Sequence, residues 1–428
     1  MELSSYLRTP FLIQRLIRNR RLKSTELREL QSKKLKALVR HSYDHVPYYR
    51  SLFKKVKLHP DDIKSIADLD KIPILKKEDI RNAQVNEITA TNFNLSKCIM
   101  GRTAGTTGIP ISVYCERETI LTMNLGIYIW QLTCGDKITN KHVKLGGHMA
   151  RPPRPIQKLG IFRTKQISFF EDIETQIEQI KNYGPKTMVT IPSLAMRLCK
   201  EIRERNIQGI NPKLVFTGGE LLNEYFRNFV KETFEAELYD SYGSMEAGFI
   251  GTECIELTGY HIWSDAVIVE STRDGEVLFS GEEGDMTVTN LDQFAMPIIR
   301  YDQGDLGILI DEECPCGSYF PLMKITRGRK MDVIQLPDGR IISASNVYYD
   351  LNSIKGIKQY QVIQERNHRL TVKIVKDRKF TEETYEEIRQ MFKQKLGNVD
   401  IDITVLDNIE RDKSGKFKSF FTRIPLKY

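Results

Sequence analysis

The fold of this chain is decided by two short stretches, Lys186-Thr187-Met188-Val189-Thr190-Ile191 and Leu214-Val215-Phe216. Both are apolar runs rich in β-branched or aromatic residues, which is typical of buried β-strands. Ahead of them, Ile173, Ile177 and Ile180 recur at the spacing of one face of an amphipathic helix. Strands that alternate with helices predict a layered α/β domain.

The first 90 residues differ from this central region, because their apolar residues recur at helical spacing throughout. We therefore expect residues 1–90 to be mostly helical. Pro47 interrupts the pattern and predicts a helix boundary. A second break is expected over residues 71–75.

The C-terminal part has a third character, which predicts a small α+β module. Residues 370–374 and 401–405 alternate between apolar and polar, like half-buried strands. Between them, Thr381 and Gly397 are suited to cap the two ends of a helix. We predict an N-terminal core domain over residues 1–328 and a C-terminal domain over residues 329–428.

Composition excludes several classes of protein. The chain has 428 residues, of which 40% are hydrophobic, so it can bury a substantial core. No apolar stretch approaches the roughly 18 residues of a membrane-spanning helix. Seven scattered cysteines do not form a disulfide framework pattern. With no signal peptide at the N-terminus, a cytoplasmic protein is expected.

The N-terminus carries part of the formal net charge of +8 and has two interpretations. Leucines and isoleucines at helical spacing lie among the basic residues Arg8, Arg15, Arg18, Arg20, Arg21 and Lys23. The favoured interpretation is a solvated helix that packs its apolar stripe on the protein itself. The alternative is peripheral contact with an anionic membrane surface. Nucleic-acid binding is not expected, because the charge is not interleaved with aromatic residues in one patch.

A Gly/Thr-rich segment, Gly101 to Pro110, is the first candidate for chemistry. Small residues let the backbone wrap closely around phosphates, and hydroxyls add hydrogen-bond donors. A hairpin or linker explains the same composition. The segment is not a Walker loop, because Ile109 follows the last glycine.

Two acidic motifs follow. Tyr239–Glu246 combines an aromatic residue suited to stack on a base with a carboxylate, Glu246, suited to hold magnesium. Arg300–Asp305 places Asp305 after a glycine, expected at a strand end, where it would accept ribose hydroxyls. The alternatives are a strand running into a turn and an aspartate-containing turn. Near the C-terminus, Lys416 lies in a glycine-containing turn and can bring a positive charge to a phosphate.

In this order and spacing, the segments resemble the motifs of the adenylate-forming superfamily, which includes acyl-CoA synthetases, adenylation domains and luciferases. The resemblance implies a large α/β N-terminal domain and a small mobile α+β C-terminal lid, with a hinge at Gly328-Arg329. It implies catalytic roles for Glu246, Arg329 and Lys416. The ATP-binding residues it implies are Thr103, Ala104, Gly105, Thr106, Thr107, Gly108, Gly218, Gly219, Glu220, Ser241, Tyr242, Gly243, Ser244, Asp305 and Arg329.

Four further segments resemble the phenylacetate–CoA ligase branch, especially its CapK-like members from capsular polysaccharide biosynthesis. They are His45–Arg50, Gly259–Trp263, Ala295–Tyr301 and Cys314–Gly317. Three positions depart from the superfamily pattern. Ile109 and Gln303 stand where lysine and threonine are usual, and Met331 stands at the hinge position where aspartate or lysine is usual.

The resemblance implies an AMP-forming ligase that uses ATP and Mg²⁺, the latter held by Glu246. It would convert a small carboxylic acid into an acyl-adenylate and pass the acyl group to coenzyme A or to an amine acceptor. Two alternatives remain open: a nucleotidyltransferase that acts on a cofactor hydroxyl, and a degenerate, membrane-associated interaction protein. Retention of the candidate site residues argues against the second. The sequence does not identify the acid, the acceptor or the oligomeric state.

A candidate metal site comprises Cys254, His261, Cys314 and Cys316. Two pairs, each close in sequence, would have to converge, as the ligands of structural zinc do. The alternative is a group of buried thiols beside a hydrogen-bonded histidine. Branch members with the same four residues resemble zinc binders, so the resemblance implies a candidate structural Zn²⁺ site beside the alternative of buried thiols.

Overall fold

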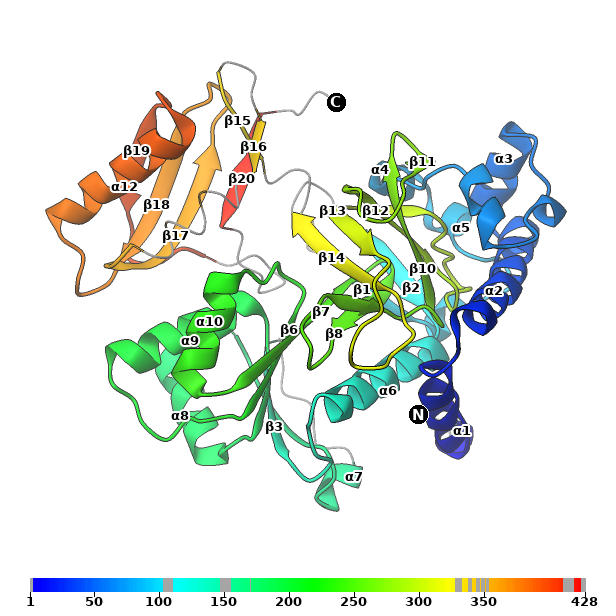
Figure 1. Ribbon diagram of the computed structural model, residues 1–428, viewed down its shortest axis with the longest axis horizontal. Helices are drawn as coiled ribbons and strands as arrows, with labels where there is room; N and C mark the ends of the chain where they lie inside the picture. Colours follow the sequence, from blue (N-terminus) through cyan, green and yellow to red (C-terminus); the bar gives the residue numbers. More distant parts are fainter. Residues whose placement is uncertain are drawn as a thin grey trace. The chain divides into compact units, whose positions relative to one another are not determined.

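The computed structural model describes residues 3–102, 111–146, 155–169, 171–327, 333–337, 341–343, 347, 351, 354–410 and 419–424 (Figure 1). The chain divides into two compact units. The first comprises Met1–Lys137 and Tyr239–Thr326, and the second comprises Ile138–Leu238 and Arg327–Tyr428. The division at residue 328, into a core and a lid, stays a prediction.

The first unit begins with the helices predicted for residues 1–90. They are α1 (Leu3–Asn19), α2 (Ser24–His45), α3 (Pro47–Lys55), α4 (Lys77–Asn82) and α5 (Val85–Ile88), with short 3₁₀ turns between α3 and α4. Pro47 is the first residue of α3, where its missing N–H costs no hydrogen bond. The predicted boundary is therefore confirmed.

The rest of the first unit is mainly β-structure. A hairpin of β1 (Ile99–Arg102) and β2 (Ser112–Cys115) precedes α6 (Arg117–Thr133). A sheet follows in the order β11-β10-β12-β13-β14-β9-β8-β7. Its strands are β7 (Glu237–Ser244), β8 (Gly248–Glu253), β9 (Tyr260–Ile262), β10 (Val267–Arg273), β11 (Glu276–Val277), β12 (Gly284–Asn290), β13 (Tyr301–Ile310) and β14 (Leu322–Arg327). Buried residues of α2 and α3, such as Leu38 and Phe53, share a core with Ile268 and Ile299.

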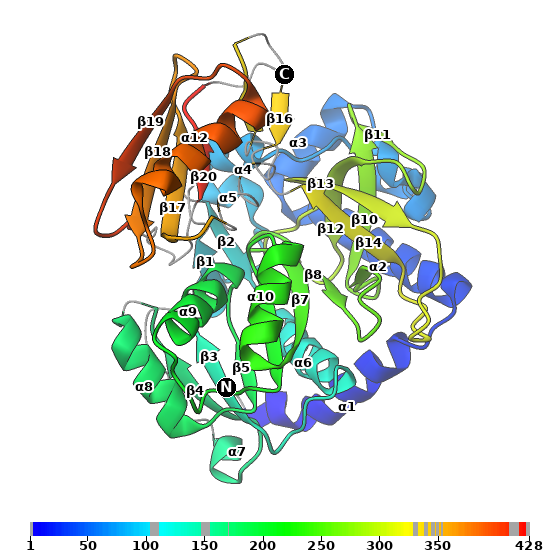
Figure 2. The same ribbon diagram turned by 60° about the vertical axis from the view of Figure 1, so that its left-hand side comes forward.

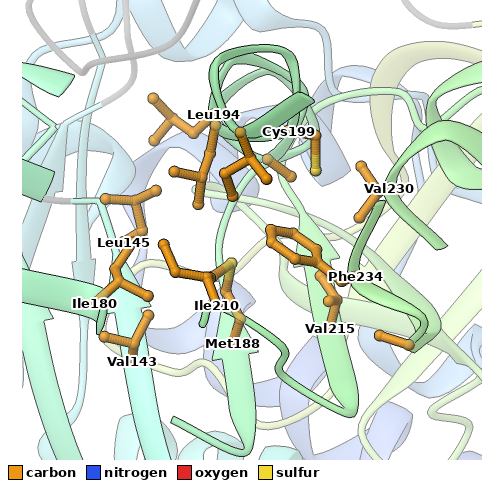
Figure 3. Packing of buried hydrophobic residues seen from close by; sticks show 14 of the residues in the cluster. Val143, Leu145, Ile180, Met188, Leu194, Cys199, Ile210, Val215, Val230 and Phe234 are labelled. Atoms are coloured by element: carbon orange, nitrogen blue, oxygen red, sulfur yellow. The ribbon is translucent and has the colours of Figure 1, made fainter. Parts of the chain in front are cut away.

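The second unit contains the alternating region that decided the fold. Parallel strands lie in the order β6-β5-β3-β4, with bounds β3 (Lys141–Leu145), β4 (Arg163–Ile167), β5 (Thr187–Val189) and β6 (Leu214–Gly218). The helices are α7 (Pro155–Lys158), α8 (Ile173–Tyr183), α9 (Pro192–Glu204) and α10 (Glu224–Phe234). Met188 and Val215 on the strands pack with Leu194 on α9 and Phe234 on α10 (Figure 3). The predicted layered α/β arrangement is confirmed.

The C-terminal residues of this unit form the predicted α+β module. Its four-stranded sheet has the order β19-β18-β17-β20. The elements are β15 (Val333–Gln335), β16 (Ile341–Ser343), β17 (Ile357–Gln364), β18 (Leu370–Lys376), α12 (Glu382–Leu396), β19 (Ile401–Val405) and β20 (Phe420–Thr422). Thr381 and Gly397 flank α12 as predicted. Ile388 and Phe392 of the helix are buried against the sheet.

Within the second unit, α9 contacts the start of β17. The Lys200 ammonium donates hydrogen bonds to the carbonyl oxygens of Ile357 (3.0 Å) and Lys358 (3.4 Å). Lys358 in turn pairs with the buried carboxylate of Glu201. Burial lowers the pKa of Lys200 to about 8, because the charged amine is removed from water. This contact makes stability depend on pH.

Part of the predicted apolar stripe of α1 packs on the protein, as in the favoured interpretation, whereas Ile17 is exposed. Leu12 and Leu16 are buried, and Asn19 Nδ2 donates a hydrogen bond of 3.0 Å to Asp265. Figures 1 and 2 both show α1 beside α6, at the edge of the first unit. None of the helices in the described residues is long and apolar enough to span a membrane.

Candidate active site

The Glu246 motif is built on the tight hairpin that joins β7 to β8. Ser244 pairs with Gly248 across the hairpin, and its hydroxyl accepts a hydrogen bond from the backbone N–H of Ala247. A Cβ at Gly243 would lie 2.5 Å from the Gly248 carbonyl oxygen, so only glycine fits there. Ser241 is buried in the strand. The turn holds the Glu246 carboxylate at a position that is only 5% exposed.

Asp305 lies on an irregular part of β13. Thr287 of β12 pairs with Asp302 of β13, and Asp285 of β12 pairs with Leu306 of β13. Two residue steps along β12 therefore correspond to four along β13. Such a bulge re-aims side chains and is frequent beside active sites. The expectation that Asp305 lies at a strand end is wrong, since β13 continues to Ile310. The aspartate-containing turn exists too, but Asp302 makes it by accepting a hydrogen bond from the Gly304 N–H.

The two motifs hold each other's carboxylates through a crossed pair of tyrosine hydrogen bonds. Tyr242, on β7, donates to Asp305 Oδ2 at 2.7 Å. Tyr301, on β13, donates to Glu246 Oε1 at 3.0 Å. Burial, together with the facing carboxylate, raises the pKa of both phenols. Both hydroxyls therefore stay protonated and remain donors at neutral pH.

A cation that the sequence analysis missed lies beside Glu246. Lys77 Nζ, at the start of α4, is 3.6 Å from Glu246 Oε1. The segment before it is attached to β13, because Leu75 exchanges backbone hydrogen bonds with Arg300 and Asp302. The sequence indicates this cation only through a break in the helical pattern that is followed by Lys76-Lys77.

A buried arginine anchors that segment. The Arg300 guanidinium donates to the Glu270 carboxylate at 3.0 Å and to the Asp70 and Ile72 carbonyl oxygens at 2.9 and 2.7 Å. The fixed fork of donors satisfies several buried acceptors at once. Arg300 thus fixes both the start of β13, which carries Tyr301, and the segment that leads to Lys77.

The strands on both sides of the Gly/Thr-rich segment form a hairpin in which Arg102 pairs with Ser112. The part of this hairpin at Gly101 lies next to the Glu246 motif, because a Cβ at Gly101 would lie 2.4 Å from Met245 Sδ. The segment itself, including Thr103, Ala104, Gly105, Thr106, Thr107 and Gly108, lies outside the described residues. The same holds for Arg329 and Lys416.

In the second unit, Gly218 ends β6 and Gly219 turns the chain with φ of +80°. Glu220 follows, and its carboxylate accepts hydrogen bonds from the Ser193 N–H (2.9 Å) and hydroxyl (3.0 Å). Ser193 is in the first turn of α9, so Glu220 caps that helix. The nucleotide-binding role predicted for Glu220 stays a prediction, beside this structural one.

The four candidate zinc ligands converge. Cys254 follows β8, His261 lies on β9, and Cys314 and Cys316 lie between β13 and β14. Their ligand atoms all lie within 4.8 Å of one another. Cys254 Sγ is 3.5 Å from Cys314 Sγ, and His261 Nε2 is 3.3 Å from Cys316 Sγ. None of the seven cysteines, all of which are described, forms a disulfide.

The surroundings of this cluster suit a metal. His261 Nδ1 is 3.0 Å from the Phe320 carbonyl oxygen, which fixes the ring with Nε2 toward the sulfurs. In a tetrahedral zinc site with Zn–S bonds of about 2.3 Å, neighbouring ligand atoms lie roughly 3.8 Å apart. The separations of 3.5 and 3.3 Å between these ligand atoms are close to this value. Arg20 also interacts electrostatically with the sulfurs of Cys254 and Cys316.

Comparison with known proteins identifies relatives of both parts of the chain. Residues 334–422 match the family model of the CapK C-terminal domain. A phenylacetate-coenzyme A ligase from Aromatoleum evansii is 30% identical over 306 residues, which cover 67% of each chain. One from Thermus thermophilus is 27% identical over 342 residues, 76% of this chain and 73% of that one.

The fold has relatives among solved structures. A crystal structure of 2-hydroxyisobutyryl-CoA ligase, in the postadenylation state with R3-HIB-AMP, superimposes with a TM-score of 0.79. The match covers 95% of this chain and 91% of that one, at 18% sequence identity. This likeness supports a shared fold, a large α/β part with a small C-terminal domain.

Proposed function

This chain is an AMP-forming ligase of the phenylacetate–coenzyme A ligase family, within the adenylate-forming superfamily, and we propose that it activates a carboxylic acid with ATP and transfers the acyl group to coenzyme A. The relatives indicate only the general class of the acid, a small organic carboxylate. The match to the CapK C-terminal domain supports testing amines and amino sugars as acceptors as well.

The observation that carries the proposal is the crossed pair of tyrosine hydrogen bonds. Tyr242 fixes Asp305, and Tyr301 fixes Glu246, so two carboxylates with different tasks are held rigidly on neighbouring motifs. A preorganised site of this kind stabilises developing charge without reorganising during the reaction. In the proposal Asp305 accepts hydrogen bonds from the ribose hydroxyls, and Tyr242 packs against the adenine.

The first step joins the acid to AMP. A carboxylate oxygen of the acid attacks the α-phosphorus of ATP, a new P–O bond forms, and the bond to pyrophosphate breaks. Two anions must be brought together, so the protein's contribution is positioning and positive charge. We assign this charge to Lys416 and Arg329, and we assign the β- and γ-phosphates to Thr103, Thr106 and Thr107. Backbone at Gly218 and Gly219 would border the nucleotide and the acid.

In the second step a thiolate attacks the acyl carbon. The bond between that carbon and the AMP oxygen breaks, so AMP leaves with an oxygen that came from the acid. Between the steps the C-terminal domain would turn about a hinge near Gly328-Arg329, as in the family. Coenzyme A supplies the thiolate in this proposal; an amine would react at the same carbon and yield an amide.

Glu246 would hold the Mg²⁺ that accompanies ATP. The fit rests on the structure: the carboxylate is a hard oxygen donor, nearly buried, with its orientation fixed by Tyr301. The ammonium group of Lys77, 3.6 Å from the same carboxylate, is a positive charge that Glu246 already pairs with. When bound, Mg²⁺ neutralises charge on the phosphates of ATP. Lys77 adds positive charge beside Glu246, in a chain whose sequence has Ile109 where the family's loop usually has lysine.

We also propose that Cys254, His261, Cys314 and Cys316 hold a structural Zn²⁺. Three sulfurs and one imidazole nitrogen are the donor set of closed structural sites, and no position is left for a substrate. The ion would tie the β13–β14 connection to β8 and β9. Three thiolates and Zn²⁺ leave one negative charge, which Arg20 would offset. Seven unpaired cysteines also favour a reducing compartment, so we propose action in the cytoplasm.

The test is Mg²⁺-dependent ATP–pyrophosphate exchange against a panel of aryl, acyl, amino and sugar acids. Exchange that requires one class of acid, and that is lost in Glu246→Gln and Lys416→Ala, is the expected result. Glu387→Gln and Lys393→Ala on the exposed side of α12 are matched controls that should exchange normally. Exchange without an acid but with a hydroxyl acceptor would establish nucleotidyl transfer instead. Once the acid is known, the thioester or amide product identifies the acceptor.

A further inference from the structure

The excess positive charge of this protein is that of its first 40 residues, which contain α1 and most of α2. Residues 1–40 contain eleven lysines and arginines and three acids, a net charge of +8. This equals the net charge of the whole chain, so residues 41–428 are neutral overall. Three of these cations are paired within the protein, Arg8 with Glu118, Lys34 with Asp292 and Arg40 with Asp61. Most of the others have no function in the proposed chemistry.

Helix α1 separates these charges from its buried stripe. Leu12, Leu16 and Asn19 form the buried row at helical spacing. The outward side consists of two neighbouring rows, Arg8-Phe11-Arg15-Arg18 and Gln14-Ile17, and Arg21 follows in the turn after the helix; all of these residues are exposed. Phe11 is 73% exposed and Ile17 is 43% exposed. Two large apolar side chains are therefore exposed to solvent beside arginines.

A basic hollow lies on α2, the next helix. It has a volume of about 650 Å³, and its lining includes the cations Arg28, Lys33 and Lys36, the hydroxyl-bearing Ser32 and Ser65, and one acid, Glu29. Three cations with two hydroxyls can receive a phosphate group. Figure 1 shows α1 and α2 following one another in the first unit.

This combination fits an anionic lipid surface better than a nucleic acid. A helix that lies on a membrane presents arginines to the headgroups and inserts apolar side chains between them. Phe11 and Ile17 occupy the positions that insert, and the arginines flank them. A nucleic-acid surface would need several stacking aromatic rings, whereas the outward side of α1 has one among the side chains that the structure describes, from residue 8 onward.

We propose that the outward side of α1, together with the basic hollow of α2, docks this enzyme on an anionic lipid membrane. The attraction is electrostatic and apolar, and it leaves the buried row of α1 in place against the protein. The inference is independent of the proposed chemistry, because none of its residues belongs to the candidate active site.

The test is co-sedimentation of the full chain with vesicles of phosphatidylcholine, with and without phosphatidylglycerol. We expect binding only to vesicles that contain phosphatidylglycerol, and its loss in high salt. Arg18→Glu with Arg21→Glu should weaken binding by about 25-fold or more, since each basic residue contributes roughly fivefold. Phe11→Ser should weaken it by about tenfold, through lost apolar burial.

The control is Arg389→Glu with Lys393→Glu, an equal change of charge on exposed positions of α12. It should bind vesicles like the wild type. Thermal melting of each variant checks that it is folded, and Phe11→Ser tests the proposal without any change of charge. Equal sedimentation of the wild type and the α1 variants would overturn the proposal. So would binding to single-stranded DNA in place of the vesicles, which would make the basic surface a nucleic-acid site.

Discussion

Replacing Tyr301 by phenylalanine removes one hydroxyl and tests how Glu246 is held. The hydroxyl donates at 3.0 Å to the carboxylate, which is nearly buried. A hydrogen bond to a charged group contributes about 1.5–3 kcal/mol. Lys77 Nζ, 3.6 Å from the same oxygen, would keep part of this restraint. We therefore expect the lower end of the range, which corresponds to a change of roughly tenfold.

The assay is ATP–pyrophosphate exchange, titrated with Mg²⁺ at fixed ATP. Tyr301→Phe should raise the Mg²⁺ concentration for half-maximal exchange by about tenfold. Calorimetric binding of ATP should weaken only when Mg²⁺ is present. Combining the change with Lys77→Met should cost more than the two single effects together, because both groups hold one oxygen.

Tyr49→Phe is the matched control. Its hydroxyl is also buried and bonds to the backbone at Pro297 and Ile299, close to the start of β13. It should lower the melting temperature and leave the Mg²⁺ dependence unchanged. If both tyrosine variants shift the Mg²⁺ dependence alike, or if neither does, the assignment of Tyr301 to Glu246 is refuted.

Three further predictions follow from other parts of the molecule. Tyr242→Phe, which frees Asp305 from its hydrogen bond, should raise the KM for ATP by about tenfold, measured in the same assay, while the Mg²⁺ dependence stays as in the wild type. Cys314→Ser should lower the bound zinc, measured by elemental analysis, from one per chain to none, and should lower the melting temperature; a zinc-free wild type would contradict this. Lys200 has a pKa of about 8 in the fold against 10.5 in the unfolded chain, which therefore binds more protons between these values. The wild type should gain up to roughly 3 kcal/mol of stability between pH 8 and pH 10.5, and Lys200→Met should show no such gain in melting experiments.

Elements specified by local sequence were predictable. The strands at residues 186–191 and 214–216 form β5 and β6, and α12 lies between Thr381 and Gly397 as predicted. The strands follow from short apolar runs and the helix from apolar periodicity and its capping residues, all of which act within a few positions along the chain. The convergence of the four cysteine and histidine ligands was also predicted, from two pairs that are each close in sequence.

The contacts that organise the site were not predictable, because they join distant residues. Tyr301 and Glu246 are 55 positions apart, and Tyr242 and Asp305 are 63 apart. Their pairing depends on strand order and on the bulge in β13, neither of which leaves a local pattern. Lys77 lies in the N-terminal helical region, so only the tertiary structure shows that it reaches Glu246.

Glu220 shows a different limit of prediction from sequence, because one residue can match a family motif and also have a structural role. Its carboxylate accepts two hydrogen bonds from Ser193 at the start of α9. A motif match alone does not distinguish a helix cap from a ligand-binding residue. The geometry supplies the cap, and only a binding measurement can test the second role.

The central claim is that the acid's own carboxylate attacks ATP, and isotope transfer tests it most directly. The enzyme would be incubated with ATP, coenzyme A and the acid that supports exchange, labelled with ¹⁸O in its carboxylate. Mass spectrometry would then be used to measure the label in the AMP released. We expect one ¹⁸O in each AMP, because the oxygen that attacks phosphorus stays with it when the thioester forms. AMP without label, or a product that retains the nucleotide as an ester, would contradict acid activation.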